Sequence, residues 1–212
     1  MPRGRAATYD AQREAILARA AQLFAERGFS DVSMNEVAQA SGVSKPLLYH
    51  YVRDKDELLV LICEGHVQRL VDLVREVAAS EASPEVRLRA MIRRFVEAYA
   101  EARHEHRVLT QDVKFLHGAG KARVLARERE VVAAFADTIA QLRPEGSADS
   151  LHKPLTMLLF GMINWMFTWL SPRGELTYES MAPVVTDLFF GGFTAVTAPR
   201  RRKQPQPKET LA

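Results

Sequence analysis

The residues of this sequence best suited to recognising a ligand lie in one short stretch, SMNEVAQASGVSKPLLYHYV, at positions 33–52. Lys45 and Tyr49 are four residues apart, as are Pro46 and His50, so each pair would share one face of a helix. The last sixteen residues of the stretch contain no Asp or Glu, and a surface that meets phosphates avoids carboxylates because like charges repel. A helix with such a face fits the major groove of DNA, which is about 12 Å wide.

The same stretch predicts two short helices separated by a tight turn. Ser33 begins a capping box, in which its side chain and that of the residue three positions later satisfy backbone N–H groups. Gly42 supplies the turn, and Ser44 caps the second helix, which has Pro46 in its first turn. We expect Leu48, four residues before the end of the stretch, to face inward. This is a helix-turn-helix arrangement.

Helical periodicity continues along the whole chain, and no strand-like alternation is present. We predict an all-α protein of about nine helices. Besides the short pair, the expected helices cover approximately residues 9–27, 54–79, 84–103, 106–116, 121–142, 149–170 and 177–198. The first three helices would form one small unit, in which Ile16, Leu23 and Phe24 contribute to a shared core.

Residues 16–62 resemble the DNA-binding domain of TetR-type (TetR/AcrR) transcriptional regulators. The resemblance is carried by Ala-Ser-Gly-Val-Ser-Lys, then Leu-Tyr, then Lys-Asp-Glu-Leu-Leu. It implies a helix-turn-helix domain at 9–54, a ligand-binding and dimerisation domain at 55–198, and a disordered basic tail at 199–212. Where the family often has Tyr-Tyr-His-Phe, this chain has Tyr-His-Tyr-Val at 49–52.

The resemblance also implies roles for individual residues on a double-stranded operator. Serines at the helix starts would contact phosphates, two residues of the third helix would lie nearest base edges, and Leu47 would touch a thymine methyl group. Arg3 and Arg5 could reach the minor groove as a flexible arm. The expected DNA-binding residues are Ser33, Ser44, Lys45, Pro46, Leu47, Tyr49, His50, Tyr51 and Lys55.

A regulator that reads two half-sites needs two heads at a fixed separation, and the family's usual dimer is built from the last two helices. Their apolar positions include Leu155, Leu158, Met162, Met166 and Trp169 on one helix and Met181, Val184, Val185, Leu188, Phe189 and Phe193 on the other. We expect these faces to form a homodimer, the alternative being that they are internal core.

The middle helices are expected to enclose a pocket for a small-molecule effector. Asn164 is a polar amide inside the most apolar run of the chain, and burying it without a partner would cost about 1–3 kcal/mol. It would bond either a ligand or its own symmetry mate. The candidate ligand-binding residues are Met91, Phe95, Tyr99, Phe115, Phe160, Asn164, Trp165 and Trp169, each of which could equally be ordinary core.

The segment after residue 160, GMINWMFTWLSPRGELTYES, resembles TetR-type repressors that sense coenzyme A thioesters of fatty acids, sterol fragments or phenylacetate. That resemblance implies an acyl-CoA or aryl-CoA effector. Its anionic part would lie near basic residues of the middle helices, namely Arg93, Arg94, Lys121, Arg123 and Arg127. The alternative is a regulator of efflux or stress genes that senses an apolar, drug-like ligand.

Composition sets limits on other classes of protein. The chain has 212 residues, a net charge of +3 and a single cysteine, which excludes an internal disulfide. The tail at 199–212 holds five basic groups and one acid, so the rest of the chain carries about −1. The longest apolar run, 155–170, is shorter than the ~20 residues of a membrane span. With no signal-peptide pattern at its start, we expect a cytoplasmic location and no membrane contact.

Catalytic and metal-binding patterns are weak. His104 and His106 are two residues apart and would not face each other on a helix. Cys63 and His66 alone do not make a zinc site. The sequence has no phosphate-binding loop, nucleophile elbow or HExxH motif. We therefore expect no catalytic residues, no metal and no cofactor.

Overall fold

The computed structural model describes residues 3–80, 82–142, 151–170 and 174–193. Within these ranges the chain has nine α-helices and two short 3₁₀ helices, η1 and η3, and no strand, which confirms the all-α prediction. The α-helices are α1 (Arg3–Arg27), α2 (Met34–Ala40), α3 (Lys45–Tyr51), α4 (Lys55–Ala78), α5 (Pro84–Glu101), α6 (Arg103–Asp112), α7 (Gly118–Gln141), α8 (His152–Asn164) and α9 (Tyr178–Phe193).

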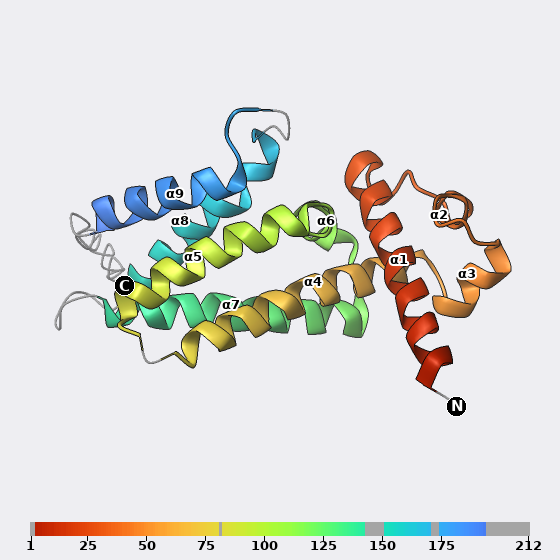
Figure 1. Ribbon diagram of the computed structural model, residues 1–212, viewed down its shortest axis with the longest axis horizontal. Coiled ribbons are helices and arrows are strands. Elements are labelled where there is room, and N and C mark those ends of the chain that lie inside the picture. Colours follow the sequence, from red (N-terminus) through yellow and green to blue (C-terminus); the bar gives the residue numbers. More distant parts are fainter. Residues whose placement is uncertain (1–2, 81, 143–150, 171–173, 194–212) are drawn as a thin grey trace, which may run out of the picture.

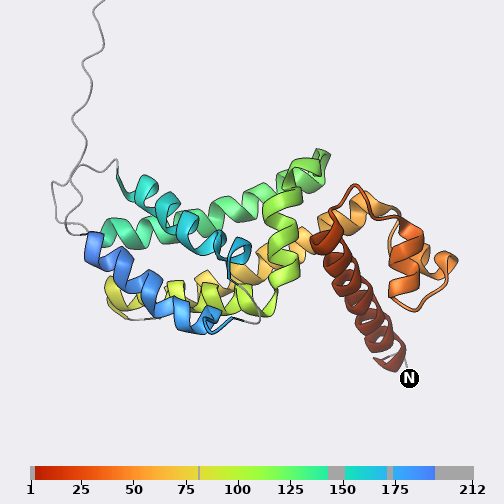
Figure 2. The same ribbon diagram turned by 90° about the horizontal axis from the view of Figure 1, so that it is seen from above.

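The molecule is elongated, with α1, α2 and α3 grouped at one end (Figure 1). Helix α4 runs from this unit into the larger bundle, where it packs against α5, α6 and α7. Helices α8 and α9 lie on the far side of the bundle from α4, and α9 packs mainly on α5. Seen from above, α1 projects away from the bundle axis (Figure 2).

Local chemistry sets the boundaries of the small helices. Gly28, with φ of +87°, follows the last residue of α1, and Gly42, with φ of +65°, makes the turn between α2 and α3. Both values lie in the left-handed region that glycine enters without steric cost. Ser44 caps α3, as predicted, by accepting a hydrogen bond from the Leu47 amide at 3.3 Å.

A single hydrophobic core runs through both parts of the molecule. In the N-terminal unit Ile16, Phe24 and Leu48 are completely or almost completely buried. Leu58 and Ile62 of α4 join the same cluster. Helix α4 is therefore shared between the small unit and the bundle, and a movement along it would be felt in both.

Some predicted boundaries are wrong. Helix α1 begins at Arg3, so the backbone of Arg3 and Arg5 is helical and is not an extended arm. Helix α8 ends at Asn164 and is followed by η3 (Met166–Thr168), so the helix predicted over 149–170 is shorter. The predicted tail at 199–212 and the last residues of the helix predicted over 177–198 lie outside the described residues.

Candidate nucleic-acid interface and effector cavity

Helix α3 exposes one face and buries the other. Leu48 is completely buried, whereas Lys45, Pro46, Tyr49 and His50 are exposed. Because the exposed residues pair at four-residue spacing, they form a continuous ridge. This ridge carries the predicted Lys45/Tyr49 face, and its geometry suits insertion into a groove.

Leu47 and Ser44 flank this ridge at the start of α3. Leu47 is 41% exposed, which is unusual for a leucine in a small folded unit and leaves its methyl groups available to a thymine methyl. The Ser44 hydroxyl accepts the Leu47 amide hydrogen bond. Its own hydrogen has no partner among the described residues and can be donated to a phosphate.

An aromatic cluster fixes the end of α3. The ring of Tyr9 from α1 packs on Tyr51 with centroids 4.7 Å apart, and it meets His50 edge-on at 6.0 Å. Tyr51 is half-buried by this contact, whereas His50 stays exposed. Of the two neighbours, His50 is therefore the better placed to reach DNA. The sequence analysis assigned no role to Tyr9, although Tyr9 begins the helix that was predicted over residues 9–27.

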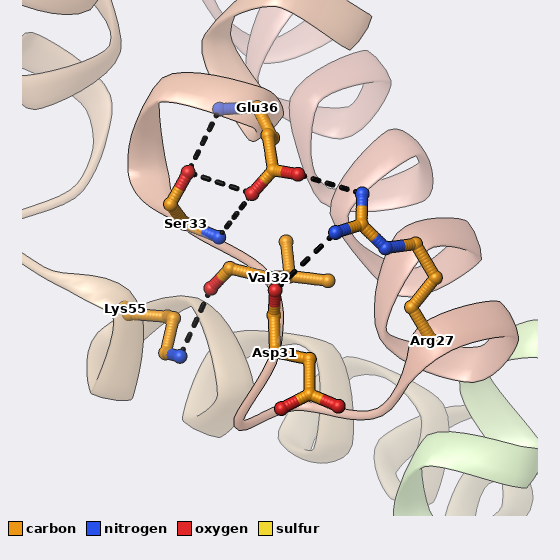
Figure 3. A network of polar contacts seen from close by, with 6 residues as sticks. All are labelled: Arg27, Asp31, Val32, Ser33, Glu36 and Lys55. Carbon is orange, nitrogen blue, oxygen red and sulfur yellow. Dashed lines mark hydrogen bonds and ion pairs between the residues drawn. The ribbon is translucent and has the colours of Figure 1, made fainter.

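Ser33, predicted to contact a phosphate, uses both of its donors within the chain. Its backbone N–H and its hydroxyl both donate to Glu36 Oε2, at 2.8 and 2.7 Å (Figure 3). Arg27 pairs with the same carboxylate at 2.7 Å. The hydrogen bonds from Ser33 lower the pKa of Glu36 to about 2. Ser33 therefore caps the N-terminus of α2, and the Glu36 carboxylate beside it would repel a phosphate.

Lys55 was also predicted to contact the DNA backbone, and in this structure its ammonium is bonded within the chain. Its ammonium donates to the carbonyls of Phe29, Ser30 and Val32 at 2.8, 3.2 and 2.9 Å. Figure 3 shows the contact with Val32. The ammonium also lies 4.4 Å from the centre of the Phe29 ring. Because an ammonium has three hydrogens, Lys55 is fully used in tying α4 to the α1–α2 loop.

The bundle contains a cavity of about 340 Å³ beside the middle of α4. Its lining comes from α4, α5, α6, α7 and α8 and from the first residue of η1 (Val113–Phe115). The lining residues are Val67, Leu70, Tyr99, His106, Leu109, Thr110, Val113, Glu128, Val131, Val132, Met157, Phe160 and Asn164. This size falls within the usual range for small-molecule sites, about 300–1,000 Å³.

Other hollows on the surface have a different character. One of about 350 Å³ lies between the starts of α4 and α7, and one of about 510 Å³ lies between α4 and α5. Both are lined by several Asp, Glu and Arg side chains. Small-molecule sites are mostly apolar with a few polar groups, so the cavity beside α4 is the better candidate.

Polar groups in this cavity form a connected set. The Tyr99 hydroxyl donates to Asn164 Oδ1 at 2.8 Å, and the Tyr99 ring stacks on His106 with centroids 3.6 Å apart. Nδ1 of His106 lies 3.4 Å from Nε2 of His66. In the described part of the chain, Nε2 of His106 has no partner in hydrogen-bond geometry, although the Asn164 backbone lies near it.

Burial governs the protonation of these groups. It lowers the pKa of His66 to about 3 and that of His106 to about 4, because the imidazolium form would be desolvated. The same cause raises the pKa values of Tyr99 and Glu128 and brings that of the Cys63 thiol to about 12. Both histidines are therefore neutral near pH 7, and Cys63 is an inert thiol.

The predicted ligand-binding residues separate into two groups. Tyr99, Phe160 and Asn164 do line the cavity. Met91 and Phe95 are completely buried core residues of α5 and do not line it. The other three predicted residues lie elsewhere, as described next.

Phe115 and the two tryptophans do not line this cavity. Phe115 lies in η1 and packs on Phe29 of the N-terminal unit, with ring centroids 5.4 Å apart. Trp165 and Trp169 are 60% and 53% exposed, because α8 ends at Asn164 and the following turn directs them outward. Sequence reasoning also missed His106 and Glu128, whose inward orientation depends on how α6 and α7 are rotated.

The basic residues expected to hold an anionic effector group are mostly paired. Arg94 lies 2.7 Å from Glu76, and both Arg123 and Arg127 contact Glu64. Arg93 lies 3.9 Å from Glu97. The pairs of Arg93 and Arg94 are exposed and therefore weak. Glu64, the partner of Arg123 and Arg127, is only 17% exposed, so these two arginines are less available.

An exposed apolar face covers the outside of α8 and α9. Leu158 and Leu188 are 66% and 65% exposed, and Trp165, Trp169 and Val184 are each more than half exposed. Six of the residues predicted for a dimer face are instead buried or partly buried within the chain: Leu155, Met162, Met166, Met181, Val185 and Phe189. Contiguous exposed apolar patches of this kind mark interaction sites.

None of the helices in the described ranges is long and apolar enough to cross a membrane. No group of three or more His, Cys, Asp or Glu side chains in those ranges is arranged to hold a metal ion.

The fold and the exposed α3 ridge define a helix-turn-helix transcriptional regulator, and sequence comparison agrees. Residues 16–62 match the family "Bacterial regulatory proteins, tetR family", and residues 81–193 match "Tetracyclin repressor-like, C-terminal domain". The chain belongs to the TetR family of transcriptional regulators.

Individual relatives are similar over most of their length. The transcriptional activator FasR of Mycolicibacterium smegmatis is 25% identical over 202 residues, which cover 93% of this chain and 90% of FasR. A TetR-family regulator from Bordetella parapertussis superposes with a TM-score of 0.80 and 32% identity, covering 88% and 98% of the two chains. AibR, solved with isovaleryl coenzyme A and operator DNA, superposes at 0.75 and 27% identity, covering 84% and 97%.

Proposed function

We propose that this protein is a ligand-responsive transcriptional repressor that binds a palindromic operator as a homodimer and releases it when a CoA thioester binds. The effector is an acyl-CoA or an aryl-CoA such as phenylacetyl-CoA. One observation carries the proposal. The cavity is lined by Val67 and Leu70 of α4, the same helix whose Leu58 and Ile62 lie in the core of the DNA-binding unit.

This arrangement gives an effector a direct physical route to the DNA. If α4 can take two positions in the bundle, a ligand that binds the protein more tightly in one of them increases the population of that conformation. Because Lys55 at the start of α4 holds the α1–α2 loop, the α3 ridge must follow. Two ridges in a dimer fit two half-sites only at one separation, so a small shift weakens operator binding.

The dimer is supported by the exposed apolar face of α8 and α9. Leu158, Trp165 and Leu188 are each at least 60% exposed, and such surface is stabilised by burial at about 25 cal/mol per Å². Helices α8 and α9 belong to the bundle and lie away from α3 (Figure 1). Two copies joined there would leave both ridges free.

The CoA thioester is supported by the similarity to AibR, which was solved with isovaleryl coenzyme A. The cavity of about 340 Å³ has room for an acyl or small aryl group, with the nucleotide portion of CoA left outside. We place that portion near the arginines of the middle helices, which would exchange their carboxylate partners for phosphates.

A second candidate is a regulator of efflux or stress genes that senses an apolar, drug-like molecule. It is favoured by one observation. Arg94, Arg123 and Arg127 already have carboxylate partners, so no ready-made phosphate cluster faces the cavity. In either case we propose a cytoplasmic protein without catalytic residues, metal or cofactor.

The test is operator binding with and without effector. The DNA upstream of the protein's own gene is labelled, and its fluorescence anisotropy is followed during titration with the protein. Isovaleryl-CoA, longer acyl-CoA esters, phenylacetyl-CoA and a panel of apolar drugs are then added to the complex. The proposal expects release by at least one thioester and none by free CoA. Release by drugs alone would select the second candidate.

The direction of regulation is tested separately, because FasR is named an activator. A promoter–reporter fusion is compared with and without the regulator gene. Higher reporter output in the deletion strain supports repression. Lower output would show that the protein is an activator and would overturn that part of the proposal.

A further inference from the structure

The cavity beside α4 has an unusual charge composition. None of its lining residues is Arg or Lys, and its only acidic residue is Glu128 of α7. His106 is the only basic side chain in this lining, and it is neutral near pH 7 because it is buried. The wall therefore offers no positive charge to a ligand.

Glu128 adds a specific obstacle to anions. Within the described residues it has no hydrogen bond and no ion pair, unlike its neighbour Glu130, which binds Arg75 at 2.7 Å on the outer surface. Its carboxyl also disfavours the anionic forms of the nearby Tyr99 hydroxyl and Cys63 thiol. A carboxylate ligand placed beside Glu128 would be desolvated, and it would also be repelled by the ionised form of Glu128, whose pKa is raised by burial.

Asn164 supplies the opposite preference, for a neutral acceptor. The Tyr99 hydroxyl donates to Asn164 Oδ1 at 2.8 Å, so the amide oxygen already has a hydrogen-bond partner within the chain. The two hydrogens on Nδ2 then have no partner in the described part of the chain. A carbonyl oxygen of a bound molecule can accept from them.

We propose that the cavity selects an uncharged carbonyl compound, recognised by Asn164, and rejects the free carboxylic acid of the same chain through Glu128. This inference rests on the effector role proposed above and narrows it. The regulator would respond to the activated thioester form of an acid and not to the acid itself. It would therefore report on the reaction class that converts an acid into its thioester.

The experiment uses matched ligands that lack the nucleotide portion of CoA. Isothermal titration calorimetry compares the N-acetylcysteamine thioester, the methyl ester and the free acid of isovaleric, octanoic and phenylacetic acids. We expect the neutral forms of at least one chain to bind wild-type protein at least tenfold more tightly than the acid. Asn164→Leu should lose that advantage for the thioester, with folding checked by thermal melting.

The decisive variant is Glu128→Gln, with Glu130→Gln as the matched control on the same helix. Glu128→Gln should tighten binding of the acid at least threefold and leave the thioester within twofold, whereas Glu130→Gln should change neither. Equal binding of acid and thioester by wild-type protein, or an unchanged ratio in Glu128→Gln, would overturn the inference.

Failure of the inference and failure of the proposed function give different results. If no matched ligand binds but an apolar drug releases the operator, this inference is wrong and an effector-responsive regulator remains. If no ligand of any class affects operator binding, both are wrong.

Discussion

The ring of Phe29, in the α1–α2 loop of the N-terminal unit, packs on the ring of Phe115 in η1 with centroids 5.4 Å apart. The ammonium of Lys55, in α4, also lies over the Phe29 ring, 4.4 Å from its centroid. Phe29 therefore meets both the start of α4 and the link between α6 and α7. The same link begins at Val113, which lines the cavity. The two aromatic rings thus connect the cavity wall to the DNA-binding unit.

We predict that Phe115→Ala weakens the coupling between effector and operator. The unliganded protein should still bind DNA, because Phe115 is not in the DNA-binding unit and is 37% exposed. The ratio of operator Kd with and without effector should fall about fivefold, or about 1 kcal/mol of coupling. Anisotropy titrations measure it. Val86→Ala, an exposed position at the start of α5, is the control and should leave the ratio unchanged.

Lys55→Met should destabilise the N-terminal unit. The change removes three hydrogen bonds to the Phe29, Ser30 and Val32 carbonyls, two of them partly buried. Loss of charged donors of this kind costs about 1.5–3 kcal/mol in total once partial exposure is allowed for. Urea unfolding followed by circular dichroism measures the change. If Lys55 instead binds phosphate, stability would be unchanged and the salt dependence of operator binding would fall.

The histidine pair predicts that stability depends on pH below neutrality. The pKa values of His66 and His106 are lowered to about 3 and 4, from the usual 6.5. Below pH 6.5 the unfolded chain therefore binds more protons than the folded chain. Stability should be complete above pH 6.5 and fall toward pH 4, at a limiting slope of about 1.4 kcal/mol per pH unit for each histidine.

Urea midpoints between pH 7.5 and 4.5 test this slope. The variant His66→Gln/His106→Gln should lower the stability at pH 7.5 but show a flatter dependence over the same window. A double variant with an unchanged slope would assign the pH dependence to other groups.

The dimer prediction is tested by Leu188→Glu in α9. Leu188 is 65% exposed in the monomer, so a charge there should not disturb the core but should oppose burial against a second copy. We expect a monomer by light scattering at micromolar concentration and at least tenfold weaker operator binding. Glu179→Gln, at the start of the same helix, should stay dimeric. A dimeric Leu188→Glu would place the interface elsewhere.

Much of the fold follows from local sequence rules. Gly42 and Ser44 define the turn and the start of α3 without reference to the rest of the chain. The alternation of buried Leu48 with exposed Tyr49 follows from helical periodicity. These features depend on residues no more than four positions apart, which a sequence displays directly.

The errors arise where distant segments meet. Lys55 contacts carbonyls 23 to 26 positions earlier, and no local pattern distinguishes that role from a phosphate contact. Phe115 was expected in the effector pocket but packs against Phe29 of the N-terminal unit. His106 was considered only as a metal ligand but lines the cavity. Both placements depend on the tertiary packing of α6 and η1.

The most direct test of the central claim is operator binding by Lys45→Ala and Tyr49→Ala, the exposed pair on α3. Fluorescence anisotropy with the DNA upstream of the protein's own gene should show each variant at least tenfold weaker than wild type. Light scattering should show the same oligomeric state for all three proteins. Wild-type affinity in both variants would contradict the assignment of α3 as the DNA-reading helix.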